Sequence, residues 1–116
     1  MTRPKLKIEV IQNGAVARET TFEDFPILFG RGSECNFRLD EHGFVSRVHG
    51  SISLDGDSIV VTDLNSSNGI EVDGRLEKTI RGLGELNFKI RDLAVRLSLD
   101  GTENQEREET DITVYA

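Results

Sequence analysis

The feature that most constrains this chain is a series of short blocks in which apolar and polar residues alternate. Alternation with a period of two puts the apolar side chains on one face, as in a strand with one buried side. No segment shows a convincing helical period. The blocks, some of them compact apolar runs, are 6–12, 16–22, 26–29, 48–54, 58–64, 70–72, 85–90 and 93–99. Strands this short and this closely spaced predict an all-β fold, an antiparallel β-sandwich.

The residues between the blocks predict turns and two longer loops. Asn13-Gly14 separates the first two blocks and is a strong signal for a tight hairpin. By contrast, 30–45 and 65–69 are interrupted by Gly, Ser, Asn and Asp too often for regular structure, so we expect loops there. Loops held on a rigid sandwich commonly carry binding groups, so the site is expected in these two segments.

Length and charge divide the chain into a body and a tail. Its 116 residues suit one domain, which we place at 1–99, followed by an acidic flexible tail or linker at 100–116. The chain has 14 Lys and Arg against 21 Asp and Glu, a net charge of −7, and five of these excess charges lie in 100–116. This balance argues against binding to nucleic acid or an anionic membrane. A local basic pocket in the nearly neutral body remains compatible with it.

Cysteine and histidine usage favours a reduced, metal-free protein. The single cysteine, Cys35, has no partner within the chain, and no leader or membrane-spanning apolar run is present, so a cytoplasmic location is the default expectation. Cys35, His42 and His49 are seven residues apart, which matches no established metal-ligand spacing. Neither a metal nor a cofactor is therefore expected.

Three short motifs carry groups that suit an anion. Gly30-Arg31-Gly32 presents a guanidinium, whose planar fork of donors fits phosphate or carboxylate. Ser46-Arg47-Val48-His49 combines a hydroxyl, a cation and an imidazole, and Ser66-Ser67-Asn68-Gly69 supplies short polar donors in a turn. Each motif alone is most simply an ordinary surface loop.

Together and in this order, the motifs match a known pattern. Phe29-Gly30-Arg31, then 45–49 (Val-Ser-Arg-Val-His), then 63–69 (Asp-Leu-Asn-Ser-Ser-Asn-Gly), followed by Val72-Asp73-Gly74, make the chain resemble a forkhead-associated (FHA) domain over roughly residues 6–99. The resemblance implies a β-sandwich of about eleven strands that binds a phosphothreonine peptide through loops at one end. This agrees with the fold class predicted from the strand blocks.

The resemblance also assigns roles to individual residues. It implies phosphate contacts from four side chains: Arg31, Ser46, Arg47 and Ser67. It implies that Asn68 holds the peptide backbone and that Phe44 favours an apolar residue at the third position after the phosphothreonine. Structural support of the loops falls to Gly30, His49 and Gly69. Gly50 and Ile70 depart from the commonest family residues, but neither is a phosphate donor.

The function that follows is a phosphothreonine-dependent protein interaction module in signalling downstream of Ser/Thr kinases. The alternative is a phosphate-independent interaction or oligomerisation module of a larger regulatory protein. A hydrolase built from Ser46, His49 and Asp63 is disfavoured, because the sequence has no G-x-S-x-G elbow and no separate oxyanion loop. Thr110 or Thr113, set among acidic residues, is a further candidate: once phosphorylated, either one would be a ligand within the chain's own tail.

Overall fold

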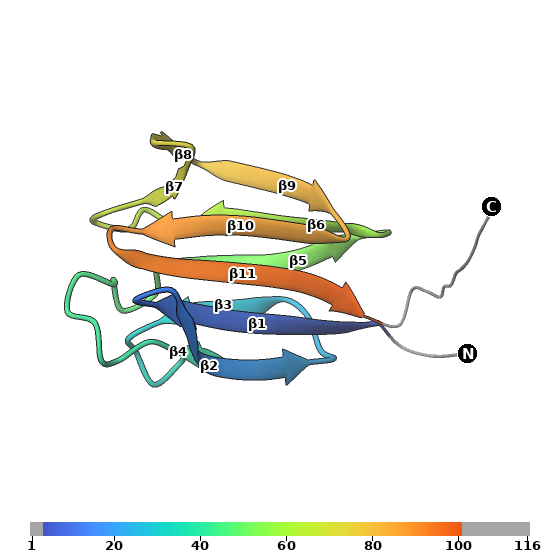
Figure 1. The fold of residues 1–116 in the computed structure, drawn as a ribbon, viewed down its shortest axis with the longest axis horizontal. Helices are drawn as coiled ribbons and strands as arrows, with labels where there is room; N and C mark the ends of the chain where they lie inside the picture. The colour runs from blue at the N-terminus through green and yellow to red at the C-terminus, as the bar shows by residue number, and fades with distance from the viewer. Residues whose placement is uncertain (1–3, 101–116) are drawn as a thin grey trace.

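The computed structural model describes residues 4–100, which form an all-β sandwich (Figure 1). The described residues contain these strands: β1 (Lys5–Gln12), β2 (Ala15–Phe22), β3 (Ile27–Gly30), β4 (Phe37–Arg38), β5 (Gly50–Asp55), β6 (Ser58–Asp63), β7 (Ile70–Val72), β8 (Arg75–Glu77), β9 (Thr79–Leu83), β10 (Glu85–Ile90) and β11 (Leu93–Asp100). A six-stranded sheet has the order β2-β1-β11-β10-β7-β8, and a five-stranded sheet has the order β4-β3-β5-β6-β9. The predicted fold class is confirmed.

The predicted hairpin at the start of the chain is confirmed as well. β1 and β2 pair antiparallel, with Gln12 opposite Ala15 across the two-residue turn. Asn13 and Gly14 have φ values of 55° and 77°, the left-handed conformation that a tight turn of this kind requires at both positions. Local turn chemistry therefore sets the register of the first two strands.

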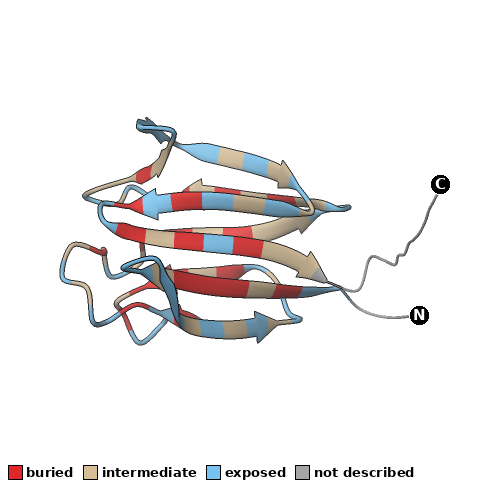
Figure 2. Cartoon of the chain, viewed as in Figure 1, coloured by how far each residue is buried: buried red, intermediate tan, exposed pale blue. Residues whose placement is uncertain are grey.

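Alternation delivers one face of strands such as β1, β6 and β11 to a core between the sheets (Figure 2). Leu6, Ile8 and Val10 of β1 are fully buried, and so is Leu97 of β11, which pairs with Ile8. The ring of Phe29 in the five-stranded sheet lies 5.7 Å from that of Phe88 in the six-stranded sheet. The core therefore joins the two layers into one body.

Three strands were not predicted, and one begins later than expected. β4 lies inside 30–45, where we expected only loops, and it pairs parallel to β3, so the sheets are not wholly antiparallel. β8 and β9 were also missed, whereas the other eight strands fall on the predicted blocks. The block expected from residue 48 becomes a strand only at Gly50, because the chain turns at Arg47-Val48.

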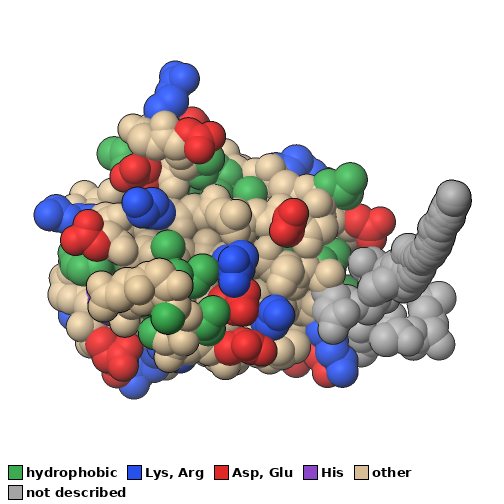
Figure 3. All heavy atoms as spheres, viewed as in Figure 1, with side chains coloured by type: hydrophobic (Ala, Val, Ile, Leu, Met, Phe, Trp, Pro, Cys, Tyr) green, Lys and Arg blue, Asp and Glu red, His purple; other side chains and the backbone are tan. Residues whose placement is uncertain are grey.

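The long loops gather at one end of the sandwich. In Figure 1 the segment between β3 and β5 and the loop between β6 and β7 lie at the left, whereas β1 begins and β11 ends at the right. β11 runs to Asp100, one residue past the predicted end of the body; 101–116 of the predicted tail lies outside the described residues. Positive and negative side chains are interspersed over the face shown in Figure 3.

Within residues 4–100 there is no helix long and apolar enough to cross a membrane.

Candidate functional site

Backbone hydrogen bonds tie the loops at this end to one another. The N–H of Arg31 donates to the carbonyl of Ser46 at 3.0 Å, and the N–H of Gly32 donates to the carbonyl of Arg47 at 2.9 Å. Gly30 permits this approach, because a Cβ there would lie 2.3 Å from the carbonyl oxygen of Arg47. Gly30 is thus required by close packing of two loops, consistent with the supporting role expected for it.

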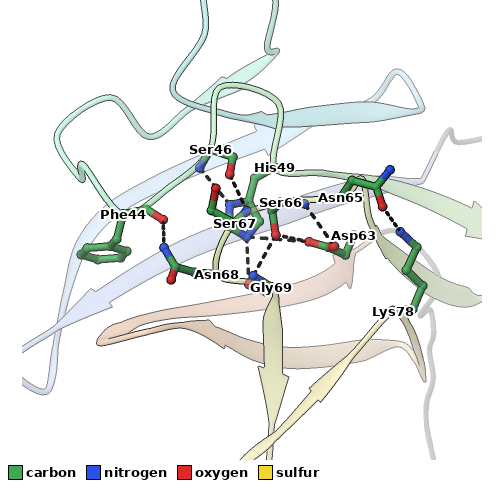
Figure 4. A network of polar contacts seen from close by, with 10 residues as sticks. All are labelled: Phe44, Ser46, His49, Asp63, Asn65, Ser66, Ser67, Asn68, Gly69 and Lys78. Atoms are coloured by element: carbon green, nitrogen blue, oxygen red, sulfur yellow. Dashed lines mark hydrogen bonds and ion pairs between the residues drawn. The ribbon is translucent and has the colours of Figure 1, made fainter.

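His49 lies at the centre of the loops and is completely buried (Figure 4). Its Nδ1 accepts a hydrogen bond from the backbone N–H of Ser46 at 3.1 Å, so the ring proton is on Nε2, which donates to the carbonyl of Gly69 at 2.8 Å. Burial lowers the pKa of His49, and the bond to Gly69 and the nearby carboxylate of Asp63 oppose that shift only in part. A neutral imidazole therefore joins the loop of Ser46 to the loop of Gly69.

The ring of Phe29, which stacks on His49, explains why the strand β5 starts with glycine. Phe29 stacks against His49 with ring centroids 5.9 Å apart and an interplanar angle of 26°. A Cβ at position 50 would lie 2.6 Å from Cζ of Phe29. The departure from the family pattern at Gly50 thus accompanies a large aromatic ring packed over it.

The geometry does not build a Ser-His-Asp triad. Both nitrogens of His49 are engaged with backbone groups, and neither is bonded to Oγ of Ser46. Asp63 lies 4.0 Å from Nε2, which points its proton at Gly69 instead. The imidazole therefore cannot act as a base on Ser46 in this arrangement.

Asp63 instead stabilises the β6–β7 loop. Its carboxylate accepts hydrogen bonds from both the backbone N–H, at 3.3 Å, and the hydroxyl of Ser66. Oγ of Ser66 in turn accepts from the N–H of Gly69 at 2.8 Å, and Gly69 has a φ of 72°. Sequence reasoning missed Ser66 in this role, although a carboxylate three residues before a serine is a recognisable turn signal.

Ser46 and Ser67 are brought together at the surface of this end. Oγ of Ser46 accepts a hydrogen bond from the N–H of Ser67 at 2.9 Å, which leaves the hydroxyl proton of Ser46 free to donate outward. Ser67 is exposed, and its own hydroxyl has no hydrogen-bond partner among residues 4–100. The structure thus places two predicted phosphate donors side by side.

Arg31 is half-buried beside the same segment. Its Nε donates to the carbonyl of Val45, the residue before Ser46. No carboxylate within the described part of the chain forms an ion pair with Arg31, and the two terminal nitrogens have no hydrogen-bond acceptor there. The guanidinium is therefore held from one edge with its fork of donors unused.

Arg47 differs from Arg31, because its guanidinium forms an ion pair with a carboxylate. Its guanidinium lies 3.2 Å from Oε1 of Glu34, and both side chains are about half exposed or more. Sequence reasoning missed Glu34, since no local pattern links it to a residue thirteen positions along the chain. Arg47 lies at the end of the molecule where the site was predicted, but its guanidinium is paired with Glu34.

Asn68 and Phe44, the two predicted peptide-binding residues, contact each other directly. Nδ2 of Asn68 donates to the backbone carbonyl of Phe44 at 2.7 Å, which leaves Oδ1 of Asn68 available (Figure 4). The ring of Phe44 packs on the edge of the core, with its centroid 5.6 Å from that of His42. The predicted contact of this ring with a peptide stays a prediction.

Among the described residues no three His, Cys, Asp or Glu side chains are grouped as metal ligands. Cys35 is buried, and its Sγ donates to the carbonyl of Arg47 at 3.1 Å. Burial, which raises the pKa of the Cys35 thiol, keeps it protonated. Cys35 therefore supports the β4–β5 loop rather than offering a ligand.

Comparison with known proteins agrees with this geometry. The family model for the FHA domain matches residues 27–87, more than half of the chain, so the chain belongs to the FHA domain family. No curated protein matches it.

Solved structures share the same fold. The first FHA domain of Rv1747 from Mycobacterium tuberculosis has a TM-score of 0.70 and 20% identity, covering 84% of this chain and 98% of that one. An FHA domain solved in an analysis of phosphothreonine-dependent FHA domain interactions has a TM-score of 0.68 and 22% identity, covering 81% and 95%. Mycobacterium tuberculosis EmbR in complex with a low-affinity phosphopeptide has a TM-score of 0.68 and 25% identity, covering 81% of this chain and 24% of EmbR.

Proposed function

We propose that this FHA domain binds phosphothreonine-containing protein segments through the loops at the end of the sandwich that holds Arg31. The observation that carries the proposal is the unused fork of Arg31. A half-buried guanidinium fixed at Nε by the carbonyl of Val45, with no carboxylate partner among residues 4–100, is a site prepared for an anion from outside.

The groups around Arg31 match a phosphate better than a carboxylate. A phosphothreonine carries about −1.5 to −2 charge at neutral pH and three acceptor oxygens. Arg31 supplies the charge, and the hydroxyls of Ser46 and Ser67 supply two further donors, with the two residues linked by the hydrogen bond from the backbone N–H of Ser67 to Oγ of Ser46. Each bond to the charged phosphate contributes about 1.5–3 kcal/mol. Because the loops are already fixed by His49, little ordering is needed on binding.

Asn68 and Phe44 supply contacts beyond the phosphate. The free Oδ1 of Asn68 is positioned to accept a backbone N–H of the bound peptide. The partly buried ring of Phe44 favours an apolar residue at the third position after the phosphothreonine. Arg47 adds positive charge and becomes a donor to the phosphate when it leaves Glu34.

The chain acts in this proposal as an interaction module in the cytoplasm, in signalling downstream of Ser/Thr kinases, and not as an enzyme. The FHA domain solved in the analysis of phosphothreonine-dependent interactions and the EmbR complex with a phosphopeptide support this function. The engaged nitrogens of His49 support the absence of hydrolase chemistry.

The sequence suggests one specific candidate ligand, which is the chain's own tail. If Thr110 or Thr113 is phosphorylated, it would have to travel from the end of β11 to the opposite end of the sandwich (Figure 1). The eight residues of β11 span about 26 Å, and ten further residues reach about 33–36 Å only when fully extended. Docking into a second copy does not require the tail to span the length of its own sandwich. Sedimentation of the kinase-treated chain tests this, and a monomer with a phosphorylated tail would contradict it.

A titration with one peptide in three forms tests the proposed function. The peptide is selected from a library with phosphothreonine fixed at its centre, then prepared with phosphothreonine, phosphoserine or unmodified threonine. Only the phosphothreonine form is expected to bind well, at roughly micromolar strength or about −8 kcal/mol. Arg31→Ala should abolish this binding, whereas Arg81→Ala, which removes an exposed arginine paired with Asp55, should not. Equal binding of the unmodified form would refute the proposal and favour a phosphate-independent module.

A further inference from the structure

A large aliphatic side chain lies exposed beside the candidate site. Among residues 4–100 the exposed large hydrophobic side chains are Val16, Leu64, Leu76 and Leu83. Leu76 is 69% exposed and lies on β8, in the hairpin that β7 and β8 form next to the β6–β7 loop. One exposed leucine is ordinary on a protein surface, so a role for Leu76 in binding must be argued from its position.

The position of Leu76 is fixed by contact with the loop that presents Asn68. A Cβ at Gly69 would lie 3.3 Å from Cδ2 of Leu76, so the isobutyl group of Leu76 lies directly over Gly69. Asn68, whose Nδ2 donates to the carbonyl of Phe44, is the residue immediately before. An apolar surface therefore begins one residue from the group expected to hold the peptide backbone.

Charged residues of both signs surround Leu76. Glu71 pairs with Leu76 across the β7–β8 ladder, and directly paired residues share one face of the sheet. Arg75 and Glu77, on either side of Leu76 in β8, project to the opposite face. Figure 3 shows charged side chains of both signs around the projection that this hairpin forms, next to hydrophobic atoms. Lys89 of β10 pairs with Glu71 in turn, so this face carries an exposed cation beside the carboxylate.

We propose that Leu76 forms a second subsite, which takes an aliphatic side chain of the phosphopeptide. The proposal rests on the proposed function, because the peptide must first be anchored by Arg31 and Asn68. The occupant is the same chain segment that carries the phosphothreonine, on the side of it that passes Gly69. Covering an exposed leucine with an aliphatic side chain removes apolar surface from water on both partners, which supplies the affinity.

The test uses a double-mutant cycle on selected peptides. A library with phosphothreonine fixed and every flanking position randomised should select Leu, Ile, Val or Met at a position other than the third after the phosphothreonine, which Phe44 is proposed to contact. Replacing that residue by Ala should weaken binding to the unaltered domain about tenfold, or about 1.4 kcal/mol. Leu76→Ala should weaken binding of the aliphatic peptide by a similar factor and leave the alanine peptide unchanged. Leu76→Met, which keeps an aliphatic surface, should retain the preference.

Leu83→Ala is the matched control. Leu83 is 76% exposed, as open as Leu76, but it ends β9 at the opposite end of the sandwich (Figure 1). The aliphatic preference should survive in Leu83→Ala. Thermal unfolding of each variant should match that of the unaltered chain, since both leucines are exposed.

The outcomes separate this inference from the proposed function. If binding still needs phosphothreonine and Arg31, but Leu76→Ala keeps the aliphatic preference, the subsite is wrong and the proposed function stands. The same conclusion follows if the library shows no aliphatic preference other than at the third position, or if sedimentation shows that Leu76 holds a dimer of the unliganded chain. If the unmodified peptide binds equally well, the proposed function itself fails.

Discussion

Replacing His49 with Ala should destabilise the whole domain and loosen both binding loops. The imidazole is completely buried and joins the backbone N–H of Ser46 to the carbonyl of Gly69. Truncation leaves these two groups without a partner and opens a cavity beside the ring of Phe29. Asn at position 49 retains an acceptor near the place of Nδ1 but cannot reach Gly69, so it should have an intermediate effect.

The magnitude follows from the contacts that are lost. Each partly buried backbone group left without a partner costs about 1–3 kcal/mol. Loss of the buried ring adds its packing against Phe29, so the free energy of unfolding should fall by about 3–5 kcal/mol for His49→Ala. His49→Asn should cost about 1–3 kcal/mol, since one of the two hydrogen bonds is kept. For a domain of this size the alanine variant should melt about 12 °C lower or more.

Urea denaturation of the three proteins at pH 7.5 measures these differences. The expected order of unfolding free energy is wild type, then His49→Asn, then His49→Ala. The phosphopeptide affinity of the folded fraction of the alanine variant should also fall, because Ser46 and Gly69 no longer share a link. An alanine variant within about 1 kcal/mol of the wild type would refute the claim that this imidazole holds the site together.

Three further predictions concern the same loops. The pKa of His49 is lowered in the folded protein, so the unfolded state takes up its proton first as the pH falls. The free energy of unfolding, measured by urea titration, should therefore fall as pH drops below about 6.5. The slope should approach about 1.4 kcal/mol per pH unit and should be smaller in His49→Asn. Gly30→Ala should destabilise by about 2 kcal/mol or more in the same assay, because its Cβ would meet the carbonyl of Arg47, whereas Gly43→Ala, with no atom in the way, should be neutral. Glu34→Gln should raise phosphopeptide affinity about two- to fivefold in anisotropy titrations by releasing Arg47, and weaker binding would show that Glu34 supports the site instead.

The sequence predicted those parts of the fold that depend on local pattern. Asn13-Gly14 specifies its turn through backbone conformation alone, and the alternation in 93–99 is long enough to identify a strand and its buried face. Strands without such a pattern were missed. The three residues of β8 are all exposed, and β4 has only Phe37 in the core, so their pairing depends on neighbours that the local sequence does not reveal.

The candidate site, like the fold, could be predicted only where a local sequence motif identifies its residues. The motif residues Arg31, Ser46 and Ser67 were identified as candidates, and the structure brings them to one end of the molecule. What the sequence did not reveal are contacts over long separations. The ion pair of Glu34 with Arg47 and the cover that Leu76 places over Gly69 both depend on how loops and hairpins pack after folding.

Nuclear magnetic resonance of the isotope-labelled chain, titrated with the selected phosphothreonine peptide, tests the central claim most directly. We expect saturable shifts at the side chain of Arg31 and at the amides of Ser46, Ser67 and Asn68, with none at Leu83 at the far end. The unmodified peptide should leave all of these signals in place. Shifts that are the same with both peptides, or that fall on another face while Arg31 is unmoved, would contradict the claim that this end of the sandwich binds phosphothreonine.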